Sequence, residues 1–466
     1  MQTMSILALV SCAVSLAAAN PANVEARATK SSSEGSSGTG STLPTITTKG
    51  NAFFAGDSRF YIRGIDYQPG GSSDITDPLA DYSICSRDIP YFKQLGLNTI
   101  RVYTVDNSAN HDQCMSALAD AGIYLALDVN TPKYSLNRAS PGPSYNPTYL
   151  QSIFATIDAF AGYSNTLLFF SGNEVLNAPD TTSAAPYVKA VTRDMKQYVG
   201  ERGYRSIPVG YSAADVTENQ YLMAQYMDCG ETQTLSDFYA INNYEWCDPS
   251  SYTTSGWSNL VAQYSNYSLP LFMSEYGCIK NTRTFEETAE LYQPEMTKVF
   301  SGGLVYEYSL EGNGFGIVTL SGSTVSPEGD QFSYLQKALA SATSPSGDGG
   351  YTTSSTTQNC PDQGTNWDTS PFIGSALPAM PSGAETYLKN GAGSGPGLTG
   401  DGSQNAGGES TSTADPNAGS VTASPTGGSK TSKAAANSVQ MGRMDFAPLV
   451  CGGLVLLSMV FGAALL

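Results

Sequence analysis

The sequence predicts a barrel of eight parallel strands surrounded by helices, and three observations lead to this fold class. Apolar runs of strand length recur between residues 44 and 345, and they number eight. Most of them are continuously apolar, which is typical of strands that helices cover on both faces. Segments with helical patterns separate the runs. Eight alternations of this kind predict an α/β protein with a (β/α)8 TIM barrel.

The predicted strands follow one another along the chain. The first four are FYIRGID at 60–66, NTIRVYT at 98–104, IYLALDV at 123–129 and TLLFFSG at 166–172. The last four are SIPVGYS at 206–212, FYAINNY at 238–244, LPLFMSE at 269–275 and GGLVYEYS at 302–309. Candidate helices between them include RDIPYFKQLG at 87–96 and YVKAVTRDMKQYVGERG at 187–203. The second of these helices ends on a glycine, as helix C-termini often do.

The first 19 residues form a short apolar stretch that ends in three alanines. This order predicts a secretory signal peptide that is cleaved after Ala19. A membrane-spanning helix is the alternative, but the apolar run is too short for one. We therefore expect the chain to enter the secretory pathway.

The other end of the chain reads SKAAANSVQMGRMDFAPLVCGGLVLLSMVFGAALL. Small residues, a short polar spacer and an apolar tail in this order predict a GPI-attachment signal. We expect Asn437 or a neighbouring alanine as the attachment residue and 438–466 as the removed propeptide. A permanent tail anchor is the alternative, but no basic residue follows the apolar run. A GPI lipid would hold the protein at the outer face of the plasma membrane.

Two segments are rich in Gly, Ser and Thr, residues 20–43 and 391–437. Such segments cannot bury enough apolar surface to offset the entropy lost on ordering. We expect a flexible N-terminal linker and a disordered C-terminal stalk. Residues 346–390 then form an extension between the barrel and the stalk.

The charge of the chain argues against one class of partner. Acidic residues outnumber basic ones, 41 to 23, and the formal net charge is -18. This is the wrong sign for a protein that binds a phosphate backbone, so we expect no nucleic-acid partner.

The cysteines indicate disulfides instead of a metal site. Cys12 lies in the predicted signal peptide and Cys451 in the apolar C-terminus. The remaining six are an even number, which suggests three disulfides in an oxidising compartment, although spacing alone leaves their connectivity open. No CxxC pair occurs, so we expect neither a metal nor a cofactor. The six cysteines are Cys85, Cys114, Cys229, Cys247, Cys278 and Cys360.

Two glutamates stand where a barrel of this class places its active site, at the C-terminal ends of the strands. Glu174, preceded by Asn173, follows the fourth apolar run, and Glu275 ends the seventh. Alone, either acid would be explained by an ion pair or a helix cap. Together they suit glycoside cleavage, in which a protonated carboxyl serves the leaving oxygen and an ionised one meets the oxocarbenium-like carbon.

The motifs around these glutamates resemble those of family-72 glycoside hydrolases, the fungal GPI-anchored β-1,3-glucanosyltransferases that remodel cell-wall glucan. The resemblance covers about residues 44–345. It rests on GNEV at 172–175, SEYGC at 274–278, KGNAFF at 49–54, FYIRGIDYQPGG at 60–71, LGLNTIRVYTVD at 95–106, INNYEWC at 241–247 and LVYEYS at 304–309.

The resemblance implies that Glu174 is the general acid/base and Glu275 the nucleophile, and that Asn173 binds the sugar 2-hydroxyl. It also implies a cleft lined by Tyr103, Asp128, Tyr244, Tyr306 and Gln68. A retaining mechanism would place the two carboxyl groups about 5–5.5 Å apart. Donor and acceptor would both be β-1,3-glucan; if water replaces the acceptor, the same site is a hydrolase.

The family pattern further implies the disulfides Cys85–Cys114, Cys247–Cys278 and Cys229–Cys360, the last of which would tie the extension to the barrel. Some family members carry a further Cys-rich carbohydrate-binding module after the barrel. Here only Cys360 follows before the stalk. The chain therefore resembles the subgroup without that module.

Other interpretations have less support. The chain has one histidine, His111, which we expect on a helix surface and not in a Ser-His-Asp site. Asn266 begins the one permitted N-glycosylation sequon, and the stalk could carry O-linked sugar. We expect the protein to be a monomer. The rival from another class is a wall-bound glucan-binding or structural protein without catalysis, although such a protein would need neither glutamate.

Overall fold

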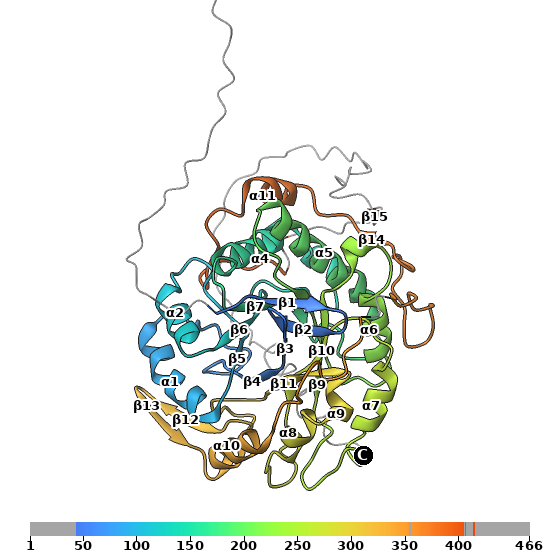
Figure 1. The fold of residues 1–466 in the computed structure, drawn as a ribbon. Coiled ribbons are helices and arrows are strands. Elements are labelled where there is room, and N and C mark those ends of the chain that lie inside the picture. Colours follow the sequence, from blue (N-terminus) through green and yellow to red (C-terminus); the bar gives the residue numbers. More distant parts are fainter. Residues whose placement is uncertain (1–42, 354–355, 405, 407–412, 415–466) are drawn as a thin grey trace, which may run out of the picture. The chain divides into compact units, whose positions relative to one another are not determined.

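The computed structural model describes residues 43–353, 356–404, 406 and 413–414 (Figure 1). All eight predicted strands are present and close into a barrel in the order β4 to β11, in which each strand runs parallel to its neighbours. The predicted fold class is confirmed. The strands are β4 Ile62–Asp66, β5 Thr99–Val102, β6 Tyr124–Asp128, β7 Thr166–Asn173, β8 Val209–Ala213, β9 Phe238–Asn243, β10 Leu271–Tyr276 and β11 Phe300–Val305.

Helices surround the barrel (Figure 1). The carboxylate of Asp81 caps the first of them by accepting from the amide of Ser83 at 2.8 Å, and Gly96 ends it with a left-handed φ of 68°. The helices are α1 Tyr82–Leu95, α2 Asp112–Asp120, α3 Pro141–Ser144, α4 Pro147–Phe160, α5 Ala185–Glu201, α6 Gln220–Met227, α7 Trp257–Tyr264, α8 Glu286–Leu291, α9 Pro294–Thr297, α10 Gln331–Ser341 and α11 Ala384–Asn390.

A small antiparallel sheet closes the N-terminal end of the barrel, and the sequence analysis did not predict it. It consists of β1 Ile46–Lys49, β2 Ala52–Ala55 and β3 Ser58–Phe60. The fully buried ring of Phe53 lies 6.3 Å from Phe238 and 5.9 Å from Phe272, measured between centroids. Burying such a ring contributes roughly 1.5–3 kcal/mol. Together with Phe170 and Leu168, these rings form the apolar filling of the barrel.

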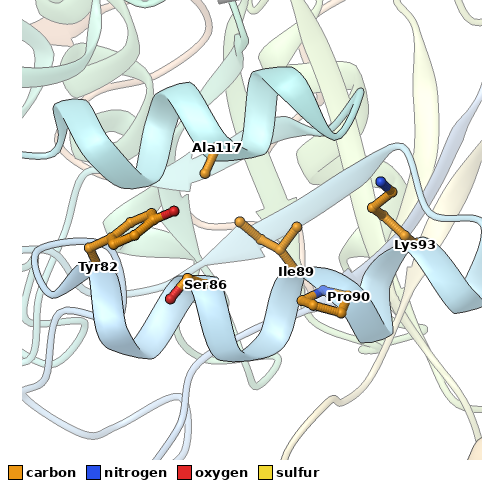
Figure 2. Close-up of a pocket in the computed structure, with 6 residues that line it drawn as sticks. All are labelled: Tyr82, Ser86, Ile89, Pro90, Lys93 and Ala117. Atoms are coloured by element: carbon orange, nitrogen blue, oxygen red, sulfur yellow. The ribbon is translucent and has the colours of Figure 1, made fainter.

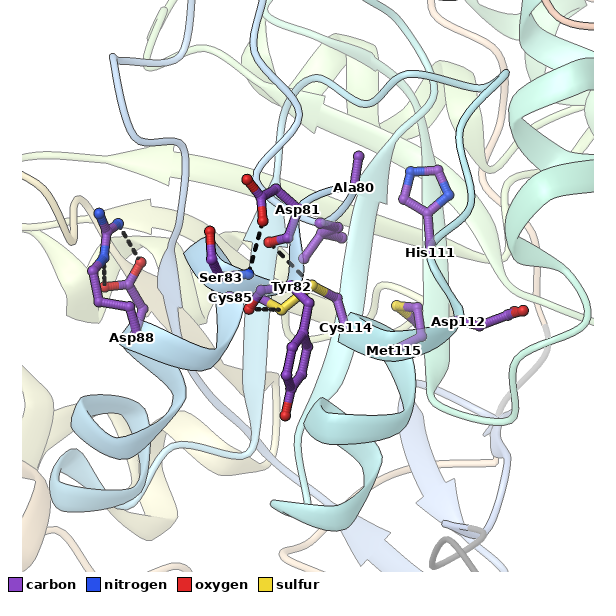
Figure 3. The surroundings of a disulfide bond; sticks show 12 residues. Ala80, Asp81, Tyr82, Ser83, Cys85, Asp88, His111, Asp112, Cys114 and Met115 are labelled. Atoms are coloured by element: carbon purple, nitrogen blue, oxygen red, sulfur yellow. Dashed lines mark hydrogen bonds and ion pairs between the residues drawn. A yellow bond between two sulfur atoms is a disulfide. The ribbon is translucent and has the colours of Figure 1, made fainter. Parts of the chain in front are cut away.

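Three disulfides are present, and they are the pairs that the resemblance implies. Cys85–Cys114 joins α1 to α2 (Figure 3). Cys247–Cys278 joins the loop after β9 to the segment just after β10. Cys229–Cys360 spans 131 residues and ties the extension to the chain just after α6.

The part of the chain that packs on the barrel extends beyond residue 390, where the disordered stalk was predicted to begin. A hairpin of β12 Val318–Ser321 and β13 Thr324–Pro327 precedes α10, and β14 Leu377–Pro378 pairs with β15 Thr413–Ala414. Residues 391–404, which we call the strap, lie against the barrel although their composition predicted the start of a disordered stalk. The prediction was wrong here because these glycines allow close approach of the backbone to barrel side chains.

None of the described helices is both long and apolar enough to cross a membrane. The predicted signal peptide, the predicted GPI-attachment signal with Asn437, and most of the predicted stalk lie outside the described residues.

Candidate active site

The C-terminal ends of the strands bring the two predicted glutamates to one site. Glu275 lies on β10, and Glu174 follows directly after β7. Asn242, on β9 between them, donates from Nδ2 to Oε1 of Glu174 at 2.7 Å. The two carboxyl groups are close enough that the charge of Glu174 raises the pKa of Glu275.

Three donors hold the carboxylate of Glu275, which is 6% exposed. The hydroxyl of Tyr103 donates to Oε1 at 2.8 Å, and Nη1 of Arg101 donates to the same oxygen at 3.2 Å. The hydroxyl of Tyr244 donates to Oε2 at 2.5 Å. This arrangement orients both oxygens and favours the ionised form.

The protonation of Glu275 reflects opposing effects. Its pKa is raised to about 7, mainly by burial and next by the charge of Glu174. Arg101 and the two tyrosine hydroxyls lower the pKa. The three donors therefore oppose the effect of burial and stabilise the anion of Glu275.

Arg101 is a functional residue that the sequence analysis did not name. Its guanidinium is fully buried, where it donates to both oxygens of Asp128 at 2.8 and 3.2 Å and stacks 4.3 Å above the ring of Tyr103. Asp66 lies 4.0 Å from the same guanidinium. A signal existed, because an arginine within the apolar run NTIRVYT must be buried and therefore needs carboxylate partners.

Glu174 lies on a strained turn. Its φ of 49° is left-handed, which costs a residue other than glycine about 1–3 kcal/mol. Its amide donates to the carbonyl of Ser212 at 2.9 Å. Arg138 donates from Nη2 to the carbonyl of Glu174 at 2.8 Å and from Nε to that of Val175 at 3.0 Å. Contacts from strand β8 and from the loop that carries Arg138 therefore fix the backbone from which this side chain extends.

Asn173 and Tyr306 lie at the same end of the barrel. Oδ1 of Asn173 accepts from Ser212 Oγ at 2.7 Å and from Asn242 Nδ2 at 3.3 Å. The ring of Tyr306 meets that of Tyr244 edge to face, with centroids 6.2 Å apart. Nδ2 of Asn313 donates to the Tyr306 hydroxyl at 3.3 Å. The structure thus brings both predicted residues to the glutamate site.

Two residues expected in the cleft have other contacts. Gln68 is 1% exposed, and its Oε1 accepts from the amides of Tyr103 and Thr104 at 3.2 and 3.0 Å. It therefore supports the backbone that carries Tyr103 and does not line the cleft. Asp128 has both oxygens bound to Arg101, so it positions the guanidinium behind Glu275.

The expected place of His111 was also wrong. The ring is 2% exposed, lies 2.7 Å from Asp77 Oδ2 and packs 4.4 Å from the ring of Phe160. A buried imidazole with a carboxylate partner at the start of α2 is structural, and it lies outside the glutamate site.

A groove of about 360 Å³ lies between α1 and α2 on the outside of the barrel (Figure 2). Its walls contain neither glutamate, so it is separate from the site described above. The residues that line it are Tyr82, Ser86, Ile89, Pro90, Lys93 and Ala117.

Comparison with known proteins identifies the family of the chain. A family model described as Glucanosyltransferase, of family-72 glycoside hydrolases, matches residues 36–343. The 1,3-beta-glucanosyltransferase gel1 of Aspergillus fumigatus is 61% identical over 356 residues, which cover 76% of this chain and 78% of the relative. The 1,3-beta-glucanosyltransferase GAS5 of Saccharomyces cerevisiae is 51% identical over 367 residues, covering 78% of this chain and 75% of the relative.

A solved structure is also similar. It is a mutant of Saccharomyces cerevisiae Gas2p in complex with laminaritetraose and laminaripentaose, with a TM-score of 0.67 and 37% identity. The match covers 73% of this chain and 75% of that chain. The likeness therefore extends over the barrel that carries the two glutamates.

Proposed function

The chain belongs to the family-72 glycoside hydrolases, the glucanosyltransferases, and from this premise we propose that Glu275 and Glu174 are the nucleophile and the general acid/base of a 1,3-β-glucanosyltransferase. The observation that carries the proposal is the environment of Glu275. Three donors favour its anion while a second carboxyl group lies nearby. One ionised and one protonated acid are what retaining glycoside cleavage requires.

In the first step, a carboxylate oxygen of Glu275 attacks the anomeric carbon of a β-1,3-linked glucose. The bond to the leaving oxygen breaks as Glu174 gives that oxygen its proton. A glycosyl-enzyme and a shortened glucan result.

In the second step, the 3-hydroxyl at the non-reducing end of another glucan gives its proton to Glu174. The resulting oxygen attacks the same anomeric carbon and displaces Glu275. One glucan is elongated at the expense of another, and both acids return to their starting states.

The side chains around the glutamates fit a glucose chain. Tyr244 and Tyr306 offer flat apolar faces and hydroxyls to the sugar rings. The oxygen of Asn173 is bound by Ser212 and Asn242, so its NH₂ group is oriented to donate to the sugar 2-hydroxyl. The Gas2p complex with laminaritetraose and laminaripentaose supports substrates of this class.

Incubation with a defined laminari-oligosaccharide tests the proposal. We expect products longer than the substrate; shorter reducing products alone would mean hydrolysis, and unchanged substrate would mean binding only. Glu275→Gln should abolish conversion, and Glu174→Gln should lower it by about 10²–10⁴-fold, with the fold intact in both. Near-normal turnover in either variant would refute the role of that residue.

We also propose that the protein is secreted and held by a GPI lipid at the outer face of the plasma membrane or in the cell wall. The order of residues at both ends of the sequence supports this, and the three disulfides fit an oxidising compartment. Release by a phosphatidylinositol-specific phospholipase tests the anchor. Asn266 is exposed, as a glycosylated asparagine must be, and a mobility shift on treatment with an N-glycanase tests its occupancy.

A further inference from the structure

We propose that the strap, residues 391–404, positions the general acid/base Glu174 through the loop between β6 and α3, residues 129–140. The strap lies beyond the segment that the family model matches. The inference rests on the proposed role of Glu174 and adds positioning residues to it: Arg138, Lys133 and the glycines of the strap.

The first link joins Glu174 to the β6–α3 loop. Glu174 adopts a left-handed φ that a residue other than glycine rarely adopts, so its direction depends on what holds its backbone. The guanidinium of Arg138 spans the carbonyls of Glu174 and Val175 at 2.8 and 3.0 Å. Arg138 is exposed and belongs to the β6–α3 loop. The position of its guanidinium therefore depends on the conformation of that loop.

The second link joins that loop to the strap. Nζ of Lys133 donates to the carbonyls of Leu398 and Gly400 at 3.0 and 3.2 Å. The carbonyl of Lys133 accepts in turn from the amide of Ser403 at 2.9 Å. Nε2 of Gln404 donates to Oγ of Ser135 at 2.7 Å. The strap therefore binds residues 133–135, just ahead of Arg138 in the same loop.

The glycines of the strap are needed for this contact. A Cβ on Gly400 would lie 2.0 Å from the hydroxyl of Tyr134, and one on Gly395 would lie 2.1 Å from Oδ1 of Asn107. Asn107 belongs to the loop between β5 and α2, and its Oδ1 accepts from the amide of Gly397 at 3.0 Å. The backbone of the strap thus lies directly on two loops at the catalytic end of the barrel.

A glycine substitution with a designed rescue tests the proposal in the full-length protein. In Gly400→Ala the new methyl group would lie 2.0 Å from the Tyr134 hydroxyl and 2.9 Å from Cβ of Pro396. Tyr134→Phe removes the closer contact, and with it the bond of 3.2 Å that the hydroxyl accepts from the amide of Gly402. We expect Gly400→Ala to lower kcat on a laminari-oligosaccharide at least tenfold with KM within twofold. The double variant should recover to within threefold of Tyr134→Phe alone. Gly364→Ala is the matched control, because its Cβ meets no atom within 4 Å.

A substrate with an activated leaving group shows whether a variant has lost only acid/base catalysis by Glu174 or the activity of the whole site. Release of fluoride from a laminari-oligosaccharyl β-fluoride needs no acid, and azide as acceptor needs no base. We expect Gly400→Ala to retain at least a third of the wild-type rate in this assay. Equal losses on both substrates, or wild-type kcat on the oligosaccharide, would overturn the proposal.

Two further variants keep the outcome decisive. Arg138→Gln should show the same dependence of the rate on the leaving group. Because Arg138 is exposed, this substitution should not disturb folding, so it tests the proposal even if Gly400→Ala does not fold. Glu174→Ala should show the dependence most strongly. If the rate of Glu174→Ala does not depend on the leaving group, the proposed role of Glu174 is wrong. If Glu174→Ala shows the dependence and both Gly400→Ala and Arg138→Gln lack it, only the proposed role of the strap is wrong.

Discussion

Glu275 and Glu174 serve one reaction, yet the structure holds them in different ways. Glu275 lies on a barrel strand, where the side chains of Arg101, Tyr103 and Tyr244 hold its carboxylate. Glu174 lies beyond the end of its strand, where its own backbone is held by Ser212 and Arg138. The nucleophile thus belongs to the core, whereas the acid/base depends on loops. Substitutions around the first should affect folding and activity together, and those around the second should affect activity alone.

Arg101→Met is the strongest test of this contrast. It leaves the buried carboxylates of Asp128 and Glu275 without their cation, which costs about 3–5 kcal/mol of unfolding free energy. We expect loss of activity as well. Arg138→Gln, on the Glu174 side, should leave the unfolding free energy unchanged in urea titrations. Equal stability losses in the two variants would contradict the division between core and loops.

Two disulfides provide the next test. Replacing Cys247 and Cys278 by serine frees a loop of 31 residues that contains Glu275 and begins three residues after Tyr244. This should cost about 3–4 kcal/mol of unfolding free energy and lower kcat. The matched control replaces Cys229 and Cys360, whose bond closes a loop of 131 residues and joins the chain between α6 and β9 to the extension. Its stability should fall at least as far while kcat stays near that of wild type. Thermal melts and product assays measure both effects.

Tyr244→Phe should have a smaller effect, on the pH profile. The lost hydrogen bond stabilised the anion of Glu275, so the pKa of Glu275 rises further above its ordinary value. We expect the acidic limb of kcat/KM to move to higher pH and the maximum to fall roughly 10-fold. Tyr306→Phe, which removes a hydroxyl that contacts Ser72 and Asn313, should leave that limb where it is.

The smallest expected effect comes from Ser212→Ala, where the two halves of the site meet. Ser212 Oγ bonds Asn173 on one side and Ser274, the neighbour of Glu275, on the other. Its loss should cost about 1 kcal/mol in unfolding free energy and a few-fold in kcat/KM. A loss above a hundredfold would mean that the two halves are coupled much more tightly than their contacts indicate.

The barrel could be predicted from the sequence because most of its strands are continuously apolar runs, as in TLLFFSG. Glu174 and Glu275 could be predicted because the fold fixes where strand ends meet. Gln68 could not, since the sequence does not show that its oxygen accepts from the amides of Tyr103 and Thr104.

The strap was mistaken for a stalk for a related reason. Glycine-rich composition accompanies both disorder and close packing of backbone on side chains, and only the positions of Tyr134 and Asn107 distinguish the two cases. Similarly, the run KGNAFF gave no sign that Phe53 would enter the barrel, because its partners Phe238 and Phe272 are distant in the chain.

The sheet of β1, β2 and β3 closes one end of the barrel. With Phe53 seated among the core rings, a polysaccharide has no route to thread along the barrel axis. A glucan must therefore bind across the C-terminal end of the barrel, where the glutamates lie. The barrel interior then sets no limit on how long the glucan is.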